Sequence, residues 1–239
     1  MSLKCGIVGL PNVGKSTLFS AISSNKAEAA NYPFCTIEPN VGIVTVPDER
    51  LNILAEFVKP NRILPTVIEF TDIAGLVKGA SQGAGLGNKF LANIREVDAI
   101  IHVVRCFEDD NILRDEGPIN PVSDKEVIET ELQLKDLESV EKKIQRTEKL
   151  AKTDPKMKAE LDVLVRCKAH LDNGKNILSL GLTKEEKVAI ADLFLLTDKS
   201  ILYVANVDEA SMHTGNKFSN ALTEAVKNEG NEVIVMTNA

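Results

Sequence analysis

One segment near the start of the chain constrains its fold more than any other. Residues 9–17 read GLPNVGKST, in which two glycines separated by four residues are followed by lysine and serine. The apolar run 5–8 before it predicts a buried parallel strand, and residues 18–22 after it predict a helix. Glycines let a loop wrap around an anion, and N–H groups of the loop and of the helix start point at it. This context predicts a P-loop that binds the phosphates of a nucleoside triphosphate.

Four further polar positions fit the same chemistry. Lys15 supplies a point charge to the phosphates, and Ser16 offers a hydroxyl to a magnesium ion. Thr36, in a proline-punctuated loop, is predicted to complete the magnesium coordination when the γ-phosphate is present. Asp72 follows an apolar run and begins an Asp-x-x-Gly motif. We expect Asp72 to bind magnesium through water and the Gly75 N–H to reach the γ-phosphate.

Apolar runs of strand length alternate with helical patterns along the chain. This alternation predicts an α/β fold, a P-loop NTPase with a mostly parallel sheet and ligands at the carboxyl ends of the strands. The expected helices between strands are residues 48–58 and 86–97. The expected strands are residues 3–10, 41–46, 67–71, 99–104, 200–206 and 232–236.

The segment 124–197 is charged and free of strand patterns. Its apolar residues recur at helical spacing, with Asp124 as the expected N-cap, and a short helix is expected over 184–194. We predict a coiled-coil-like α-helical hairpin arm inserted between two strands. Crossover helices packed on the sheet are the alternative, because an apolar stripe does not specify its partner. The stripes are Val127, Leu134, Leu137, Val140 and Ile144, then, after Pro155, Met157, Leu161, Leu164 and Leu171.

The expected organisation is therefore discontinuous. Residues 1–123 and 198–239 are predicted to form the nucleotide-binding domain, and 124–197 an inserted helical domain. The last apolar run ends three residues before the chain does, so we expect a fragment of a longer protein.

The overall composition limits the classes of partner that we expect this chain to bind. The net charge is −7 and no lysine- or arginine-rich tract is present, so direct DNA binding is not expected. Four dispersed cysteines lack zinc-ligand spacing and indicate reduced thiols. Neither a signal peptide nor an apolar run of membrane-spanning length is found, so we expect a soluble cytoplasmic protein without a membrane partner.

The motif at the end of the fifth predicted strand is expected to recognise the base of the nucleotide. GTPases carry Asn-Lys-x-Asp there, and the final aspartate accepts two hydrogen bonds from guanine. This chain has Asn-Val-Asp-Glu at 206–209, so Glu209 is one methylene too long and Asp208 comes one residue early. A displaced carboxylate leaves a guanine donor unpaired, at a cost of about 1–3 kcal/mol. Strict guanine specificity is not expected.

Together these motifs resemble the YchF subgroup of the Obg-related P-loop NTPases. The resemblance covers essentially the whole chain and implies an ATPase that prefers ATP over GTP, associates with the ribosome and regulates translation or stress responses. It also implies a C-terminal TGS domain, which this chain lacks. The motifs that carry it are GIVGLPNVGKST at 6–17, PFCTIEPN at 33–40, DIAGLVKGAS at 72–81, VVRCF at 103–107 and NVDE at 206–209.

The resemblance also assigns roles to residues. Phe107 borders the base or, alternatively, packs in the core. The phosphates fall to Asn12, Val13, Gly14, Lys15, Ser16 and Thr17, the Mg²⁺ ion to Ser16 and Thr36, and the adenine to Asn206 and the Val207 backbone, beside Glu209.

Catalysis has no obvious general base. Leu76 stands where Ras-like GTPases place a glutamine that orients water, so slow intrinsic turnover is expected. Asn12 is a candidate because related enzymes use an asparagine there to hold K⁺. Arg114 replaces a histidine that the family often carries; it stays protonated but could stabilise transition-state charge. His102 lies in a predicted core strand and is interpreted as structural.

Three other interpretations compete with the ATP-hydrolysing switch. A nucleotide-gated binding module with negligible intrinsic turnover and a GTPase both stay open. A P-loop kinase is disfavoured by the Asp-x-x-Gly motif and by the motif at 206–209.

Overall fold

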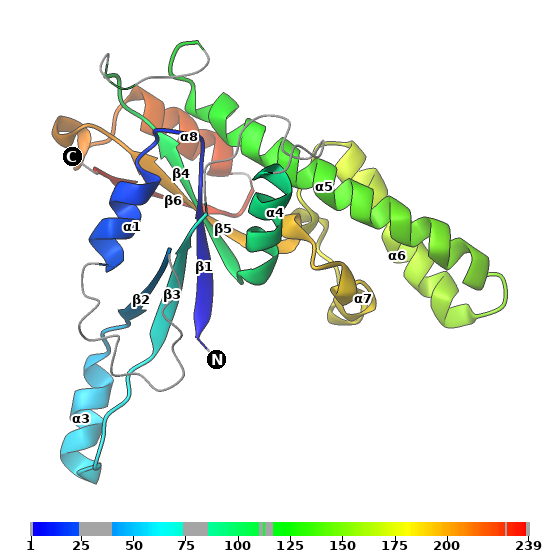
Figure 1. Cartoon of the computed structure of the whole chain (residues 1–239), viewed down its shortest axis with the longest axis horizontal. Coiled ribbons are helices and arrows are strands. Elements are labelled where there is room, and N and C mark those ends of the chain that lie inside the picture. The colour runs from blue at the N-terminus through cyan, green and yellow to red at the C-terminus, as the bar shows by residue number, and fades with distance from the viewer. Residues whose placement is uncertain are drawn as a thin grey trace.

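The computed structural model describes residues 2–23, 40–73, 86–109, 112, 117–227 and 229–237, with the side chains of 86–89 excepted. Its described strands form a six-stranded sheet in the order β2-β3-β1-β4-β5-β6 (Figure 1). Each neighbouring pair is parallel except β2 and β3, which are antiparallel. The predicted fold class is thereby confirmed. The strands are β1 Leu3–Val8, β2 Val41–Thr45, β3 Val67–Asp72, β4 Ala99–Arg105, β5 Ser200–Asn206 and β6 Glu232–Met236.

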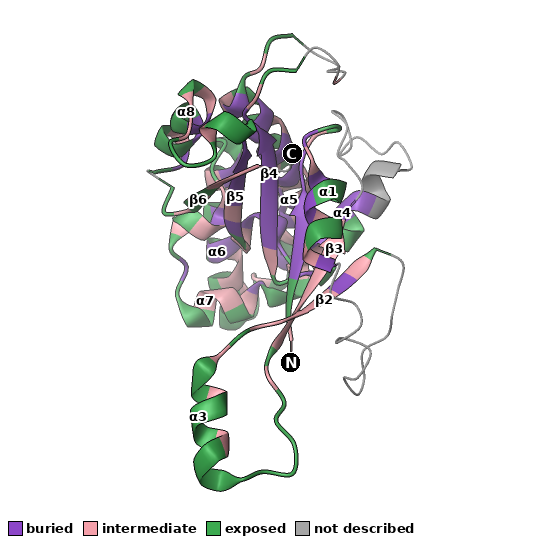
Figure 2. Cartoon of the chain, turned by 90° about the vertical axis from the view of Figure 1, so that its left-hand side faces the viewer, coloured by how far each residue is buried: buried purple, intermediate pink, exposed green. Residues whose placement is uncertain are grey.

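Alternating side chains of the central strands fill two apolar layers. One face of the sheet packs on helix α1 (Lys15–Ser23), where Ile7 and Val204 meet Leu18. The other face packs on α4 (Leu86–Glu96), α5 (Pro121–Leu150) and α8 (Lys217–Lys227). Figure 2 shows that β1, β4 and β5 are largely buried between these layers. The core therefore holds the carboxyl ends of the central strands in fixed positions.

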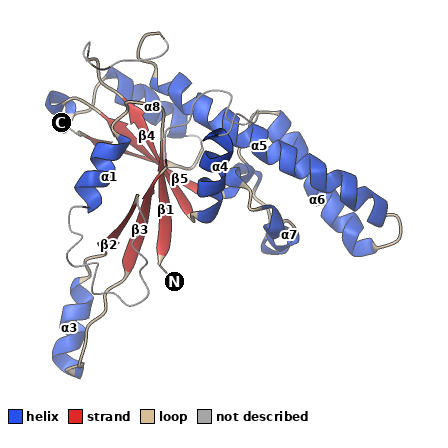
Figure 3. Ribbon diagram, viewed as in Figure 1, coloured by secondary structure: helices blue, strands red, loops and turns tan. Residues whose placement is uncertain are grey.

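Helix α5 belongs to two apolar clusters. Its first half packs Ile128 and Leu132 against the sheet. Its second half packs Val140 against Leu164 and its neighbours on α6 (Pro155–Asp172), and the two helices run side by side away from the sheet (Figure 3). The predicted hairpin and its crossover alternative thus each describe one half of α5.

Several predicted boundaries were wrong. Helix α5 starts at Pro121 with Asn120 as its N-cap, so Asp124 is a buried residue of the first turn instead of the cap. Leu134 is 43% exposed and Ile128 takes its place in the core.

The expected helix 184–194 is interrupted. Helix α7 covers only Lys184–Ala189, a 3-10 turn follows at Ala191–Leu193, and Phe194 adopts a left-handed φ of 47°. Smaller shifts move the end of β1 from 10 to 8 and of β4 from 104 to 105. Further 3-10 turns within the described residues are Ile177–Leu180, Leu196–Asp198 and Glu209–Ser211.

Helix α3 (Glu49–Val58) begins after the N-cap Asp48 and stands away from the sheet (Figure 2). Its apolar side chains Leu54 and Phe57 are 57% and 80% exposed. Among the helices of the described ranges, none has both the length and the apolar character needed to cross a membrane.

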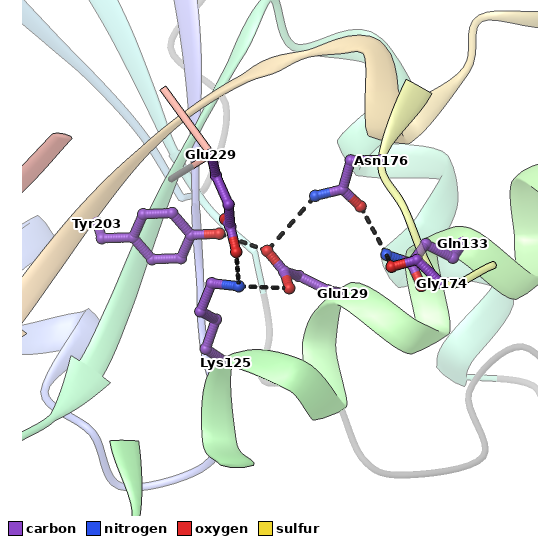
Figure 4. A network of polar contacts seen from close by, with 7 residues as sticks. All are labelled: Lys125, Glu129, Gln133, Gly174, Asn176, Tyr203 and Glu229. Carbon is purple, nitrogen blue, oxygen red and sulfur yellow. Dashed lines mark hydrogen bonds and ion pairs between the residues drawn. The ribbon is translucent and has the colours of Figure 1, made fainter. Parts of the chain in front are cut away.

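A buried polar network joins α5 to the sheet (Figure 4). The Lys125 ammonium donates to Glu129 and to Glu229, each at 2.7 Å, and the Tyr203 hydroxyl donates to Glu129 at 2.6 Å. Asn176, which follows α6 and directly precedes the 3-10 turn Ile177–Leu180, donates to the same Glu129 carboxylate at 3.4 Å. Donors from three segments of the chain therefore meet on the Glu129 carboxylate, and Lys125 links a fourth segment through Glu229.

Candidate nucleotide-binding site

The loop between β1 and α1 has the backbone geometry that the sequence motif predicts. A Cβ at Gly9 would lie 2.4 Å from the carbonyl oxygen of Val103, so no larger residue fits against β4. Asn12 and Gly14 adopt φ values of 60° and 98°, which turn the loop back towards the helix. The Leu18 N–H donates to the Gly14 carbonyl at 3.0 Å. Helix α1 thus begins directly at the loop, with its amino end at the carboxyl edge of the sheet.

Lys15 is held inside this loop. Its side chain is 8% exposed and its ammonium donates to the carbonyl of Leu10 at 2.7 Å. Burial lowers the pKa of Lys15, and the carboxylate of Asp72 opposes that shift. A positive charge is therefore placed at the loop where an anion is expected to lie.

Ser16 and Asp72 come together from α1 and β3. The Ser16 hydroxyl donates to Asp72 Oδ2 at 3.1 Å. The other carboxyl oxygen, Asp72 Oδ1, is buried and has no hydrogen-bond partner within the described ranges. A buried carboxyl oxygen without a donor indicates a missing ligand, and a hydroxyl beside a carboxylate suits the hard oxygen coordination of Mg²⁺. The residues present fit a magnesium ion.

A cavity of about 600 Å³ opens beside the loop. The loop and the start of α1 form one side, and the segments that follow β4 and β5 form the other. The lining residues are Asn12, Gly14, Lys15, Ser16, Thr17, Phe107, Glu108, Asp109, Ile112, Asn206, Val207, Asp208 and Glu209. The cavity therefore joins the predicted phosphate residues to the predicted base residues.

The Asn206 side chain holds the loop. It is 3% exposed, and its amide donates to the Val13 carbonyl at 3.0 Å. The Val207 N–H donates to the Met236 carbonyl at 2.9 Å, so this donor is already used within the sheet. The family resemblance implies that both groups face the base, but no local sequence pattern predicts their contacts with Val13 and Met236.

Asp208 is engaged within its own segment. Its carboxylate accepts from the Ser211 N–H at 3.0 Å and from the Ser211 hydroxyl at 2.9 Å, and it caps the 3-10 turn that begins at Glu209. These hydrogen bonds from Ser211 lower the pKa of Asp208. Of the two carboxylates in this motif, Glu209 is therefore the one that lines the cavity without capping the turn.

Arg105 was also missed by sequence reasoning. It ends β4, is 4% exposed, and lies opposite Asn206 in the register of β4 and β5. A charged residue at the end of an otherwise apolar strand was the available signal, because a buried arginine needs several acceptors.

Some predicted site residues fall elsewhere. Thr36, Gly75, Leu76 and Arg114 lie outside the described residues. His102 is 2% exposed in β4 with its ring centroid 5.3 Å from that of Tyr203. Burial, together with the charges of Lys125 and Lys15, lowers the pKa of His102 to about 3. His102 therefore stays neutral within the core.

Comparisons with known proteins agree on one group. A family model described as 50S ribosome-binding GTPase matches residues 4–156. The chain is 56% identical to the Ribosome-binding ATPase YchF of Escherichia coli O157:H7 over 235 residues, 98% of this chain and 64% of that protein. It is 54% identical to the protein of the same name from Bacillus subtilis over 239 residues, 99% of this chain and 65% of that protein.

A solved structure shows the same architecture. The Schizosaccharomyces pombe YchF GTPase superposes with a TM-score of 0.83 at 39% identity, over 100% of this chain and 66% of that one. The chain thus spans somewhat less than two thirds of the length of the relatives it matches. The names of these relatives differ, since the bacterial proteins are called ATPases and the Schizosaccharomyces pombe protein a GTPase.

Proposed function

Since the chain belongs to the 50S ribosome-binding GTPase family, we propose that it binds a nucleoside triphosphate with Mg²⁺ in the cavity beside the P-loop and hydrolyses it. The resemblance to the YchF subgroup, indicated by the motifs, is confirmed by relatives at 54–56% identity. The observation that carries the proposal is Asp72 Oδ1, which is buried beside the Ser16 hydroxyl and has no hydrogen-bond partner among the residues that the structure describes.

Each part of the site has a proposed task. The loop N–H groups of residues 12–17 and the start of α1 hold the phosphates, and Lys15 neutralises their charge. Ser16 and Asp72 would hold the magnesium ion, Asp72 through water, with Thr36 as a further ligand and the Gly75 N–H on the γ-phosphate. When bound, the ion neutralises charge on the phosphate oxygens.

ATP is the proposed substrate, with GTP weaker. Asp208 is occupied by Ser211, so it is poorly placed to receive a base. Glu209 reaches further than the aspartate that pairs with guanine, and a poorly placed carboxylate leaves a guanine donor unpaired. Adenine carries no such demand for an acceptor pair. Asn206, the Val207 backbone and Glu209 are proposed to border the base.

Turnover is proposed to be slow without a partner. Leu76 offers no group to orient water, and His102 is buried in the sheet. Asn12 lines the cavity and is the proposed K⁺ ligand, and Arg114 is the other catalytic candidate.

The proposed partner is the ribosome, and the proposed setting is translation or stress regulation in the cytoplasm. This rests on the family and on the names of the relatives. Residues 124–197 are proposed as a separate helical domain that carries the signal, supported by the apolar cluster that α5 shares with α6.

Phosphate release from ATP tests the activity. We expect release by the chain with Mg²⁺ that is faster in K⁺ than in Na⁺, faster with ribosomal 50S subunits, and lost in Lys15→Ala. Stoichiometric ATP binding without phosphate release under all of these conditions would favour the nucleotide-gated binding module instead.

A further inference from the structure

The wall of the cavity that follows β4 is held from beneath by one buried side chain. Arg105 donates from Nε to the Phe107 carbonyl at 3.2 Å, from Nη1 to Ile112 at 3.2 Å and from Nη2 to Asp109 at 3.0 Å. Its guanidinium carbon also lies 4.7 Å from the centroid of the Phe107 ring. Each of the three guanidinium nitrogens thus fixes a different carbonyl of one loop.

The same loop faces the candidate ligand. Phe107, Asp109 and Ile112 all line the cavity, opposite the P-loop and next to the segment after β5. Arg105 itself is buried under this wall and is not among the lining residues. Its effect on a ligand must therefore pass through the shape of the loop.

The chemistry of arginine explains why this residue type is used. A guanidinium is planar, carries five donors in a fixed fork and stacks on an aromatic face. Lysine has a single nitrogen, so it can neither reach three separate carbonyls nor present a flat face to Phe107. Without the fork, the carbonyls of Phe107, Asp109 and Ile112 lose the donors that fix their positions.

We propose that Arg105 is a positioning residue for nucleoside recognition, which holds Phe107, Asp109 and Ile112 in the wall that the nucleoside contacts. The inference rests on the proposed function, because it concerns the same cavity. The phosphate residues 12–17 are built by β1 and α1, so they are independent of this loop. Arg105 should therefore matter for the nucleoside and not for the triphosphate tail.

The test compares ATP with inorganic triphosphate, both with Mg²⁺, on Arg105→Lys. We expect ATP to bind at least fivefold more weakly while inorganic triphosphate binds within twofold of the unchanged chain. Arg166→Lys is the matched control, since Arg166 is 49% exposed on α6 and pairs with Glu186. The control should leave both affinities unchanged.

Other outcomes are decisive. Unchanged ATP affinity in a folded Arg105→Lys overturns the inference, and so does an equal loss for both ligands. If that variant does not fold, Arg105→Met replaces it; failure of both to fold would assign Arg105 to the core and also overturn the inference. If the unchanged chain binds neither ligand, the proposed function itself fails.

Discussion

At the scale of single residues, the magnesium proposal depends on the Ser16 hydroxyl and on Asp72 Oδ1, a buried oxygen that no group in the described part of the chain hydrogen-bonds. Ser16→Ala removes one oxygen ligand while leaving the loop backbone in place. We expect ATP affinity measured with Mg²⁺ to fall at least tenfold, and affinity measured in EDTA to stay the same. Ser20→Ala, at an exposed position on the same helix, is the control. A similar loss in both conditions would argue against a magnesium ligand at Ser16.

The buried His102 is expected to make the free energy of unfolding depend on pH. Its folded-state pKa is about 3, against about 6.5 in an unfolded chain. Between these values the unfolded state binds the extra proton, so the free energy of unfolding rises with pH by up to about 1.4 kcal/mol per unit. In His102→Phe this contribution should vanish, whereas in His213→Phe, at an exposed position, it should persist. Denaturant unfolding from pH 4 to 6 measures both slopes; equal slopes in His102→Phe and the unchanged chain would contradict the assignment.

Residue identities explain which site contacts could be predicted. The P-loop is local in sequence, so glycine spacing and flanking patterns were sufficient to predict it. The Asn206 amide bonds Val13 across 193 residues, and no local pattern encodes that partner. The contacts of Arg105 could not be predicted either, because its acceptors are backbone carbonyls, which residues of every type supply.

At the scale of elements, α5 and α6 should be stabilised by their own apolar cluster. Leu164 is fully buried there, and its neighbour Val165 on α6 is 51% exposed. Leu164→Ala should therefore lower the free energy of unfolding by about 2–5 kcal/mol through lost burial and a cavity. Val165→Ala should change it by less than about 0.5 kcal/mol. Equal effects in denaturant titrations would contradict the packing of this cluster.

Element boundaries show where local signals compete. Asp124 and Asn120 are both good caps, but Pro121 favours the first helical position, which makes Asn120 the N-cap. The segment 184–194 has helical spacing throughout, yet Phe194 ends it in a left-handed conformation. Packing of Ile190 and Leu195 into the α5–α6 cluster sets that ending, and tertiary contacts of this kind leave no local trace.

At the scale of the whole molecule, the buried network of Figure 4 joins α5 to the sheet. Lys125 and Glu129 have 4% and 10% exposed side chains, so Lys125→Met leaves a buried carboxylate without its cation. We expect a loss of about 3–5 kcal/mol in the free energy of unfolding. Lys142 forms the equivalent pair with Glu138 on the same helix but is 63% exposed. Lys142→Met should cost less than about 1 kcal/mol, and a comparable loss would refute the special role of the buried pair.

Competition between the two nucleotides tests the proposal that this cavity takes ATP in preference to GTP. A fluorescent ATP analogue bound to the 239-residue chain with Mg²⁺ is displaced by unlabelled ATP or GTP. Because Asp208 is held by Ser211 and Glu209 is too long to replace it for guanine, ATP should displace the analogue at concentrations at least tenfold lower than GTP. Displacement by GTP at equal or lower concentrations would contradict the claim and reassign the site to guanine nucleotides.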